Sequence, residues 1–317
     1  MRKNENTENI EGKIYQFDLK EKVTGENSKN PGTPYIAGTV EVAVDAEASN
    51  IVPVHYTYVA PTYSSGKPNN TYTALKQIIT SGKTVVTDGY DMATCVKLNP
   101  SYSVNDWYPQ GQETVQTTPR NEGGFVNIVT PDTLRPEGDV GRHKFSVDVI
   151  IFEVTEITPD EGDSYVQIKG ITFDFRNAAL PITMVARNAA AAKYFLDLEA
   201  SKKNPVYTKV WGKIVNTYIK SEKVTESAFG EATVDTIVRR NREYLITGAN
   251  PVPYEFDTEG TITAAELSKV LQDREVHLAE VKKNSEEYNA SKNAKSASPA
   301  AQAVTAMASV PQGGFSF

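Results

Sequence analysis

The sequence predicts a mainly β fold with some α (α+β), built as two tandem β-barrels followed by a C-terminal amphipathic helix and a flexible tail. The first observation is an order of element signals that occurs twice, in which three strand-like runs and one short helix precede further strands. The second is a change after residue 260 to apolar residues at helical spacing among dense charges. The length of 317 residues suits two domains of ordinary size.

The second pass, which we expect over residues 144–258, has the clearer pattern. Alternating or continuous apolar runs predict strands at 144–157, 164–176, 181–187, 206–220 and 232–246. An alanine-rich stretch that begins at Asn188 interrupts them and predicts a helix. The expected order is therefore β-β-β-α-β-β.

The first pass repeats this order over residues 12–135, after a polar N-terminus at 1–11 that we expect to be disordered. Strands are predicted at 12–23, 35–46, 51–59, 84–98 and 125–129, and a helix at 69–80. Between the last two strands, residues 99–124 read as a long loop that carries Trp107. Long loops with aromatic residues are often functional, which makes Trp107 a candidate ligand contact. The alternative is that its ring closes one end of the barrel.

The C-terminal region begins with a capping box. Thr263 is the expected N-cap, and Glu266 is placed to reach back to its amide. Apolar residues then recur on one face through residue 290, which predicts a helix over 263–290 that packs on a barrel or pairs with a second copy of the chain. Residues 291–317 are rich in Ala, Ser, Pro and Gln and predict a flexible tail.

Composition and motifs favour a binding protein over an enzyme. Cys95 is the single cysteine, no apolar run is long enough for a membrane span, and the N-terminus lacks a secretory signal. We therefore expect a cytoplasmic location without membrane contact. The three histidines lie far apart, and no nucleophile elbow, phosphate-binding loop or zinc pattern occurs. The sequence thus predicts no catalytic residue, no metal and no cofactor.

A basic segment stands out in this acidic chain of net charge −7. Residues 201–245 contain nine Lys and Arg against five Asp and Glu. Within it, strand alternation places four side chains on one face, namely Tyr207, Lys209, Trp211 and Lys213. Exposed bases can stack on such rings while ammonium groups meet phosphates, so these four are the main candidates for contact with nucleic acid. The alternative is that Tyr207 and Trp211 belong to the core.

Neighbouring strands add weaker candidates for the same surface. Lys169 shares a strand face with Phe173 and Phe175, although both phenylalanines are expected in the core. Three arginines near the last strand could contact phosphates, namely Arg239, Arg240 and Arg242.

Together, the doubled element order, the 207–213 strand and a tail that ends in Phe315 and Phe317 resemble tandem OB-fold single-stranded DNA-binding proteins of the bacteriophage replication type. The resemblance implies OB-like barrels, a non-catalytic role in DNA replication or recombination, and docking of replication proteins on Phe315 and Phe317. The Asp residues that precede the terminal Phe in that family are missing here. The sequence leaves DNA and RNA open as ligands, as well as a homo-oligomer formed through the C-terminal helix. The alternative function is a β-rich structural protein of a phage virion.

Overall fold

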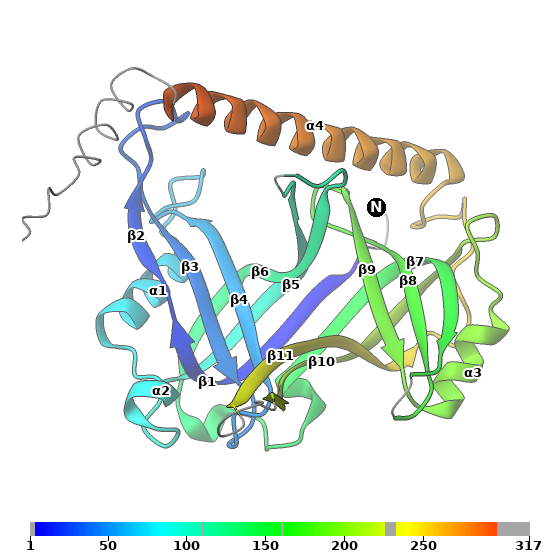
Figure 1. The fold of residues 1–317 in the computed structure, drawn as a ribbon, viewed down its shortest axis with the longest axis horizontal. Coiled ribbons are helices and arrows are strands. Elements are labelled where there is room, and N and C mark those ends of the chain that lie inside the picture. Colours follow the sequence, from blue (N-terminus) through cyan, green and yellow to red (C-terminus); the bar gives the residue numbers. More distant parts are fainter. Residues whose placement is uncertain (1–3, 110, 160–161, 226–232, 297–317) are drawn as a thin grey trace, which may run out of the picture. The chain divides into compact units, whose positions relative to one another are not determined.

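A computed structural model describes residues 4–109, 111–159, 162–225 and 233–296. It divides into two compact units. Unit 1 comprises Met1–Val104 and Pro119–Ser268, and unit 2 comprises Asn105–Thr118 and Lys269–Phe317. Eleven strands of the described residues join into one hydrogen-bonded sheet (Figure 1). The predicted mainly β fold with a C-terminal helix is confirmed.

The second pass of the sequence forms a closed ring of strands. Its elements are β7 (His143–Ile157), β8 (Tyr165–Phe173), β9 (Ala179–Ala186), α3 (Ala189–Asp197), β10 (Val206–Thr225) and β11 (Thr233–Ala249). β7 pairs with β8, β8 with β9, β9 with β11 in parallel, β11 with β10, and β10 again with β7. The helix lies between the third and fourth strands in chain order, as expected for an OB-like barrel.

The first pass forms a second ring with the same connectivity. Its elements are β1 (Asn6–Phe17), β3 (Pro34–Ala43), β4 (Ile51–Val59), α1 (Asn70–Ser81), β5 (Cys95–Trp107) and β6 (Gln116–Val129). β1 pairs with β3 and β5, β3 with β4, β4 with β6 in parallel, and β5 with β6. The short strand β2 (Lys20–Val23) adds to the edge at β3. β1 also pairs with β7 and so joins the two rings.

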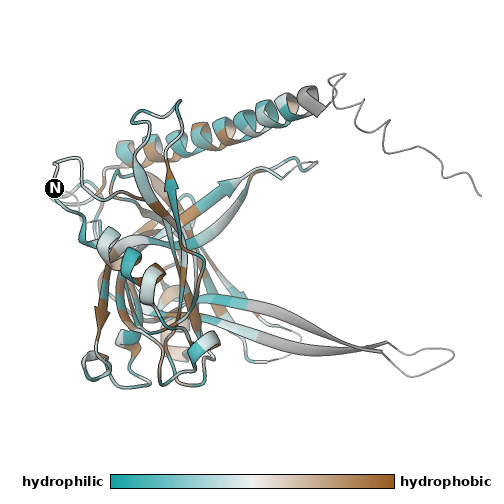
Figure 2. Ribbon diagram, turned by 90° about the vertical axis from the view of Figure 1, so that its left-hand side faces the viewer, coloured by the Kyte–Doolittle hydropathy of each residue, from teal (hydrophilic) through white to brown (hydrophobic). Residues whose placement is uncertain are grey.

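Branched apolar residues at alternate positions explain why these strands close around a core. Val40 and Val42 of β3 and Val52 and Val54 of β4 are fully buried in the first ring. Such residues favour the pleated conformation and fill the ring interior. Figure 2 shows apolar residues along the ring strands, whereas α4 (Ala264–Ser296) is largely hydrophilic.

Three local predictions within the two strand rings were wrong. Residues 6–11 belong to β1 and are not disordered, because polar side chains such as Glu8 and Asn6 find partners inside unit 1. Residues 85–88 form α2 (Val85–Asp88), since the Thr84 hydroxyl caps the Thr87 amide, where a strand was expected. Most of the expected loop 99–124 is strand in β5 and β6. Whether the two rings are separate domains with the expected limits stays a prediction.

Unit 2 contains the end of the β5–β6 hairpin and most of α4. Asp106 accepts two hydrogen bonds from the Arg274 guanidinium, at 2.6 and 2.5 Å, and His277 lies 3.3 Å away. Burial works to raise the pKa of Asp106, but hydrogen bonds from Arg274 and Thr117 outweigh it and hold that pKa below its ordinary value. This carboxylate therefore stays ionised and ties the hairpin to the helix.

The start of α4 has the predicted cap. The Glu266 amide donates to the Thr263 hydroxyl at 3.1 Å, and the Thr263 amide donates to the Glu266 carboxylate at 2.9 Å. This reciprocal pair satisfies amides that have no partner within the helix, which confirms the capping box. α4 runs to Ser296, so residues 291–296, which were expected in the flexible tail, are helical. Residues 297–317 lie outside the described residues, and Phe315 and Phe317 are among them. No helix among the described residues has the length and apolar character to cross a membrane.

Candidate nucleic-acid interface

The strand β10 alternates between the core and the outer face of the second ring. Val210 and Ile214 are fully buried, whereas Lys209, Trp211 and Lys213 point the other way and are partly exposed. Gly248 lies opposite Trp211 across the β10–β11 ladder. A Cβ on Gly248 would come within 2.4 Å of the indole, so the missing side chain lets the Trp211 ring lie directly on β11. Trp211 is thus held in place with part of its ring open to solvent.

Tyr207 departs from the prediction, because its side chain is only 1% exposed. The chain that follows β11 returns across this end of β10, where the Tyr254 amide donates to the Tyr207 carbonyl at 2.7 Å. The rings of Tyr254 and Phe256 then cover Tyr207 at centroid distances of 4.9 and 6.0 Å. The alternation correctly gives the face of Tyr207, but it carries no information about a distant segment that covers this face.

Lys209 is held by an acidic partner. Its ammonium pairs with Glu5 just before β1. Partial burial works to raise the pKa of Glu5, but hydrogen bonds from Lys209 and Ser146, with the Lys209 charge, lower it below its ordinary value. The pair is therefore ionised at neutral pH, and a phosphate would have to compete with Glu5 for Lys209.

Lys213 faces Lys144 across the β10–β7 ladder, which concentrates positive charge at this end of the strand.

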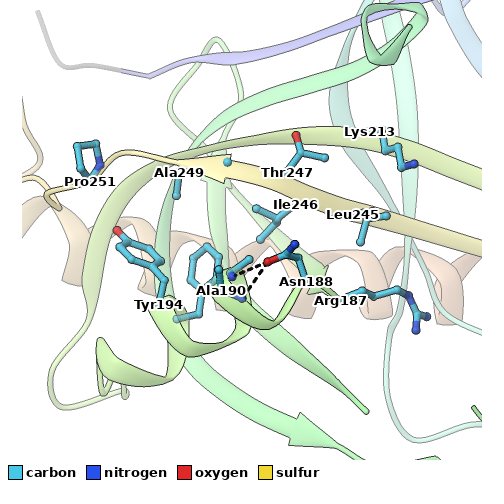
Figure 3. A pocket seen from close by; sticks show the side chains of 13 residues that line it. Arg187, Asn188, Ala190, Tyr194, Lys213, Leu245, Ile246, Thr247, Ala249 and Pro251 are labelled. Atoms are coloured by element: carbon cyan, nitrogen blue, oxygen red, sulfur yellow. Dashed lines mark hydrogen bonds between the residues drawn. The ribbon is translucent and has the colours of Figure 1, made fainter. Parts of the chain in front are cut away.

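Lys213 also lines an apolar cavity of about 530 Å³ between α3 and β11 (Figure 3). Figure 3 shows Lys213 and Arg187 near one end of the cavity and Tyr194 near the other. The Arg187 guanidinium pairs with Glu243 at 2.6 Å and lies 4.7 Å from the centroid of the Tyr165 ring. Asn188 accepts hydrogen bonds from the first amides of α3, so its side chain serves as the N-cap.

Arg242 was expected to contact phosphate, but its guanidinium makes hydrogen bonds within the protein. It donates to the Pro119 carbonyl at 2.5 Å, the Asn121 side chain at 2.8 Å and the Tyr244 hydroxyl at 2.7 Å. The Tyr244 hydroxyl lies 3.2 Å from Glu8 of β1. This cluster, which we call the junction network, links β11 of the second ring to β1 and β6 of the first. Burial raises the pKa of Glu8 to about 8, although the Arg242 charge opposes the shift.

The remaining predicted residues are spread over the molecule. Lys169 is exposed on β8 and pairs with Glu153 at 2.7 Å. The backbones of Arg239 and Arg240 lie in β11, but their side chains are outside the described residues. Trp107 lies in unit 2 with 47% of its side chain exposed, so the ring is accessible. The structure thus brings together Lys209, Trp211 and Lys213.

Sequence reasoning missed two exposed phenylalanines. Phe175 was expected in the core, yet it is 86% exposed, and Phe125 of β6 is 63% exposed. The Arg176 guanidinium lies 5.0 Å from the centroid of the Phe175 ring. The sequence contained a signal for this exposure. Asp174 and Asn177 flank Phe175 and Arg176, and both Asp and Asn favour tight turns. β8 therefore ends at Phe173, and the strand alternation does not extend to Phe175.

The geometry defines two OB-like strand rings joined in one sheet, with aromatic rings and cations on outer surfaces. The chain belongs to the YorF family, whose model matches residues 4–284. No curated protein matches the sequence.

Among the solved structures that are similar to this chain are two of the single-stranded DNA-binding protein from Thermus aquaticus. The wild-type crystal structure is 10% identical with a TM-score of 0.45, over 82% of this chain and 98% of that chain. A deletion mutant of the same protein is 9% identical with a TM-score of 0.48, over 80% and 97%. Both similarities are distant.

Proposed function

We propose that this protein binds single-stranded DNA in replication or recombination, without catalysis, along the outer surface of its two rings. The observation that carries the proposal is the outer face of β10, where Trp211 lies between Lys209 and Lys213 and rests on Gly248. A fixed, partly exposed indole offers a surface for base stacking, and the flanking ammonium groups offer charges for phosphates. Single strands suit this arrangement because their bases are unpaired and accessible.

Two further features support this proposal. Five-stranded OB barrels are a recurrent platform for oligonucleotides, and both rings have their connectivity. The net charge of −7 is compatible with DNA binding, because the local field at the contact decides attraction. Docking of replication proteins on the tail and self-association through α4 are further parts of the proposal, each testable by deletion of the segment.

Trp211→Ala is expected to weaken binding of an oligo-dT strand by about fivefold to 150-fold, since one base–aromatic stack contributes about 1–3 kcal/mol. Trp211→Phe should retain most of the affinity because a ring remains. Fluorescence anisotropy of a labelled strand in 50 mM salt measures both variants, and an oligo-rU strand compares RNA with DNA.

Lys213→Ala provides the electrostatic half of this test. It should lower the slope of log K against log salt concentration by about 0.7, as expected for one lost phosphate contact on a single strand. Lys193→Ala is the matched control, because Lys193 lies exposed on α3 and pairs with Asp197 within that helix. Failure of the unaltered protein to bind oligo-dT in 50 mM salt would rule out the proposed function.

A further inference from the structure

A second cavity in unit 1 lies where the two rings meet. Its volume is about 720 Å³, within the range of ligand sites. The walls come from β1, β4, β5 and β6 of the first ring, and from the end of β8 and the turn after it in the second. Asn6 of β1 fixes the junction: its side-chain amide donates to the carbonyls of Tyr102 and Phe173, at 2.9 and 3.0 Å.

The turn after β8 presents Phe175 and Arg176 at the cavity in an ordered conformation. Asp174 Oδ1 accepts hydrogen bonds from the amides of Arg176 and Ala178, at 2.8 and 2.7 Å. The side chain of Asn4, which precedes β1, donates to the Asp174 carbonyl at 3.0 Å. Asn177 adopts a left-handed conformation with φ of 64°, which asparagine tolerates well. A turn held by this many bonds nevertheless leaves its phenylalanine 86% exposed.

β5 and β6 contribute small residues to the lining of this cavity. Gly123 and Gly124 of β6 line the cavity, both with positive φ. A Cβ built on Gly123 would meet no atom within 4 Å, whereas one built on Gly124 would lie 1.8 Å from the Asn99 carbonyl oxygen. Ser101 and Ser103 of β5 add hydroxyl groups that can donate or accept hydrogen bonds. The cavity therefore combines an accessible aromatic face, one cation, neutral polar groups and two carboxylates. Asp174 accepts hydrogen bonds from amides of its own turn, and Glu122 accepts one from the Thr57 hydroxyl.

We infer that this cavity holds one unstacked nucleobase of the bound strand, stacked on Phe175, with the adjoining phosphate at Arg176. This inference rests on the proposed function and names a subsite for it. A flat aromatic ligand matches the exposed ring, and the serine hydroxyls can hydrogen-bond to base edges of any identity. The guanidinium beside the ring supplies the charge that a phosphate requires. A strand that crosses from one ring to the other would pass this junction.

Phe175→Ala is expected to lower the affinity for oligo-dT at least about fivefold, as for loss of one stack. The fold should persist, because the side chain is 86% exposed. Phe125→Ala is the matched control: this phenylalanine is 63% exposed in the same unit but does not line the cavity. The affinity of Phe125→Ala for oligo-dT should remain within about twofold of that of the unaltered protein, since we expect no base to contact Phe125.

Photo-crosslinking identifies the contact directly. We expect an oligo-dT strand that carries 5-iododeoxyuridine to crosslink to the tryptic peptide 170–176, which contains Phe175, and Phe175→Ala to abolish that crosslink. Arg176→Gln should lower the salt slope by about 0.7. If the unaltered protein binds DNA but Phe175→Ala binds equally well, or the crosslink falls only elsewhere, the subsite is wrong and the proposed function stands. If the unaltered protein binds no DNA, the proposed function itself fails.

Discussion

Arg242→Met is expected to lower the free energy of unfolding by about 3 kcal/mol, because it leaves hydrogen-bond acceptors of the junction network without their donor. The guanidinium donates to the Pro119 carbonyl, Asn121 and the Tyr244 hydroxyl, and methionine can replace none of these bonds. Tyr244 is 3% exposed and Asn121 is fully buried, so water cannot easily take over. Urea denaturation followed by tryptophan fluorescence measures the loss.

Arg187→Met is the control for this prediction. Arg187 forms an ion pair with Glu243 at 2.6 Å, but 42% of the Arg187 side chain is exposed. Exposed pairs contribute about 0–1 kcal/mol, so the loss should be small. Equal losses in the two variants would contradict a special role for the junction network. A further readout is DNA affinity: if Arg242 contacted phosphate, as the sequence suggested, Arg242→Met would lower the salt slope while stability stayed unchanged.

The fold was predictable because its strands bury one face and expose the other. In β10, the alternation alone placed Val210 and Ile214 in the core and Trp211 on the outside. The β-β-β-α-β-β order, seen twice, then indicated the two rings. The N-terminal residues could not be predicted in the same way. Glu8 is 3% exposed, and its partners Tyr244 and Arg242, both more than 200 positions away, make a strand with a buried acid acceptable.

The site was less predictable, since exposure depends on segments that are remote in sequence. Tyr207 has the pattern of an outer-face ring, yet Tyr254 lies over it. Phe175 has the pattern of a core residue, yet the turn that begins at Asp174 carries it out of the strand. Strand periodicity gives the direction of a side chain relative to its own sheet. It does not tell what lies above that sheet, nor the residue at which the strand ends.

Glu8 is the source of the expected pH dependence. Burial raises its pKa to about 8 in the folded protein, against an ordinary value of 4.5. Between these two values, the folded state holds a proton that the unfolded state has released. Stability therefore falls as pH rises through this window, by about 1.4 kcal/mol per pH unit. Below pH 4.5, both states carry the proton, and the contribution of neutral Glu8 is fully present.

Glu8→Gln should remove this slope, because glutamine keeps the shape of the neutral acid and does not titrate. Between pH 5.5 and 7.5, the stability of Glu8→Gln relative to the unaltered protein should rise by about 2–3 kcal/mol, as measured by urea denaturation at each pH. Glu153→Gln is the control, since its hydrogen bond from Lys169 lowers the pKa of Glu153 and confines any effect to more acidic conditions. Parallel pH profiles for Glu8→Gln and the unaltered protein would mean that Glu8 is ionised in the fold. Arg242 would then be the counterion of a buried carboxylate, and the junction network would be an ion pair, not a set of neutral hydrogen bonds around one cation.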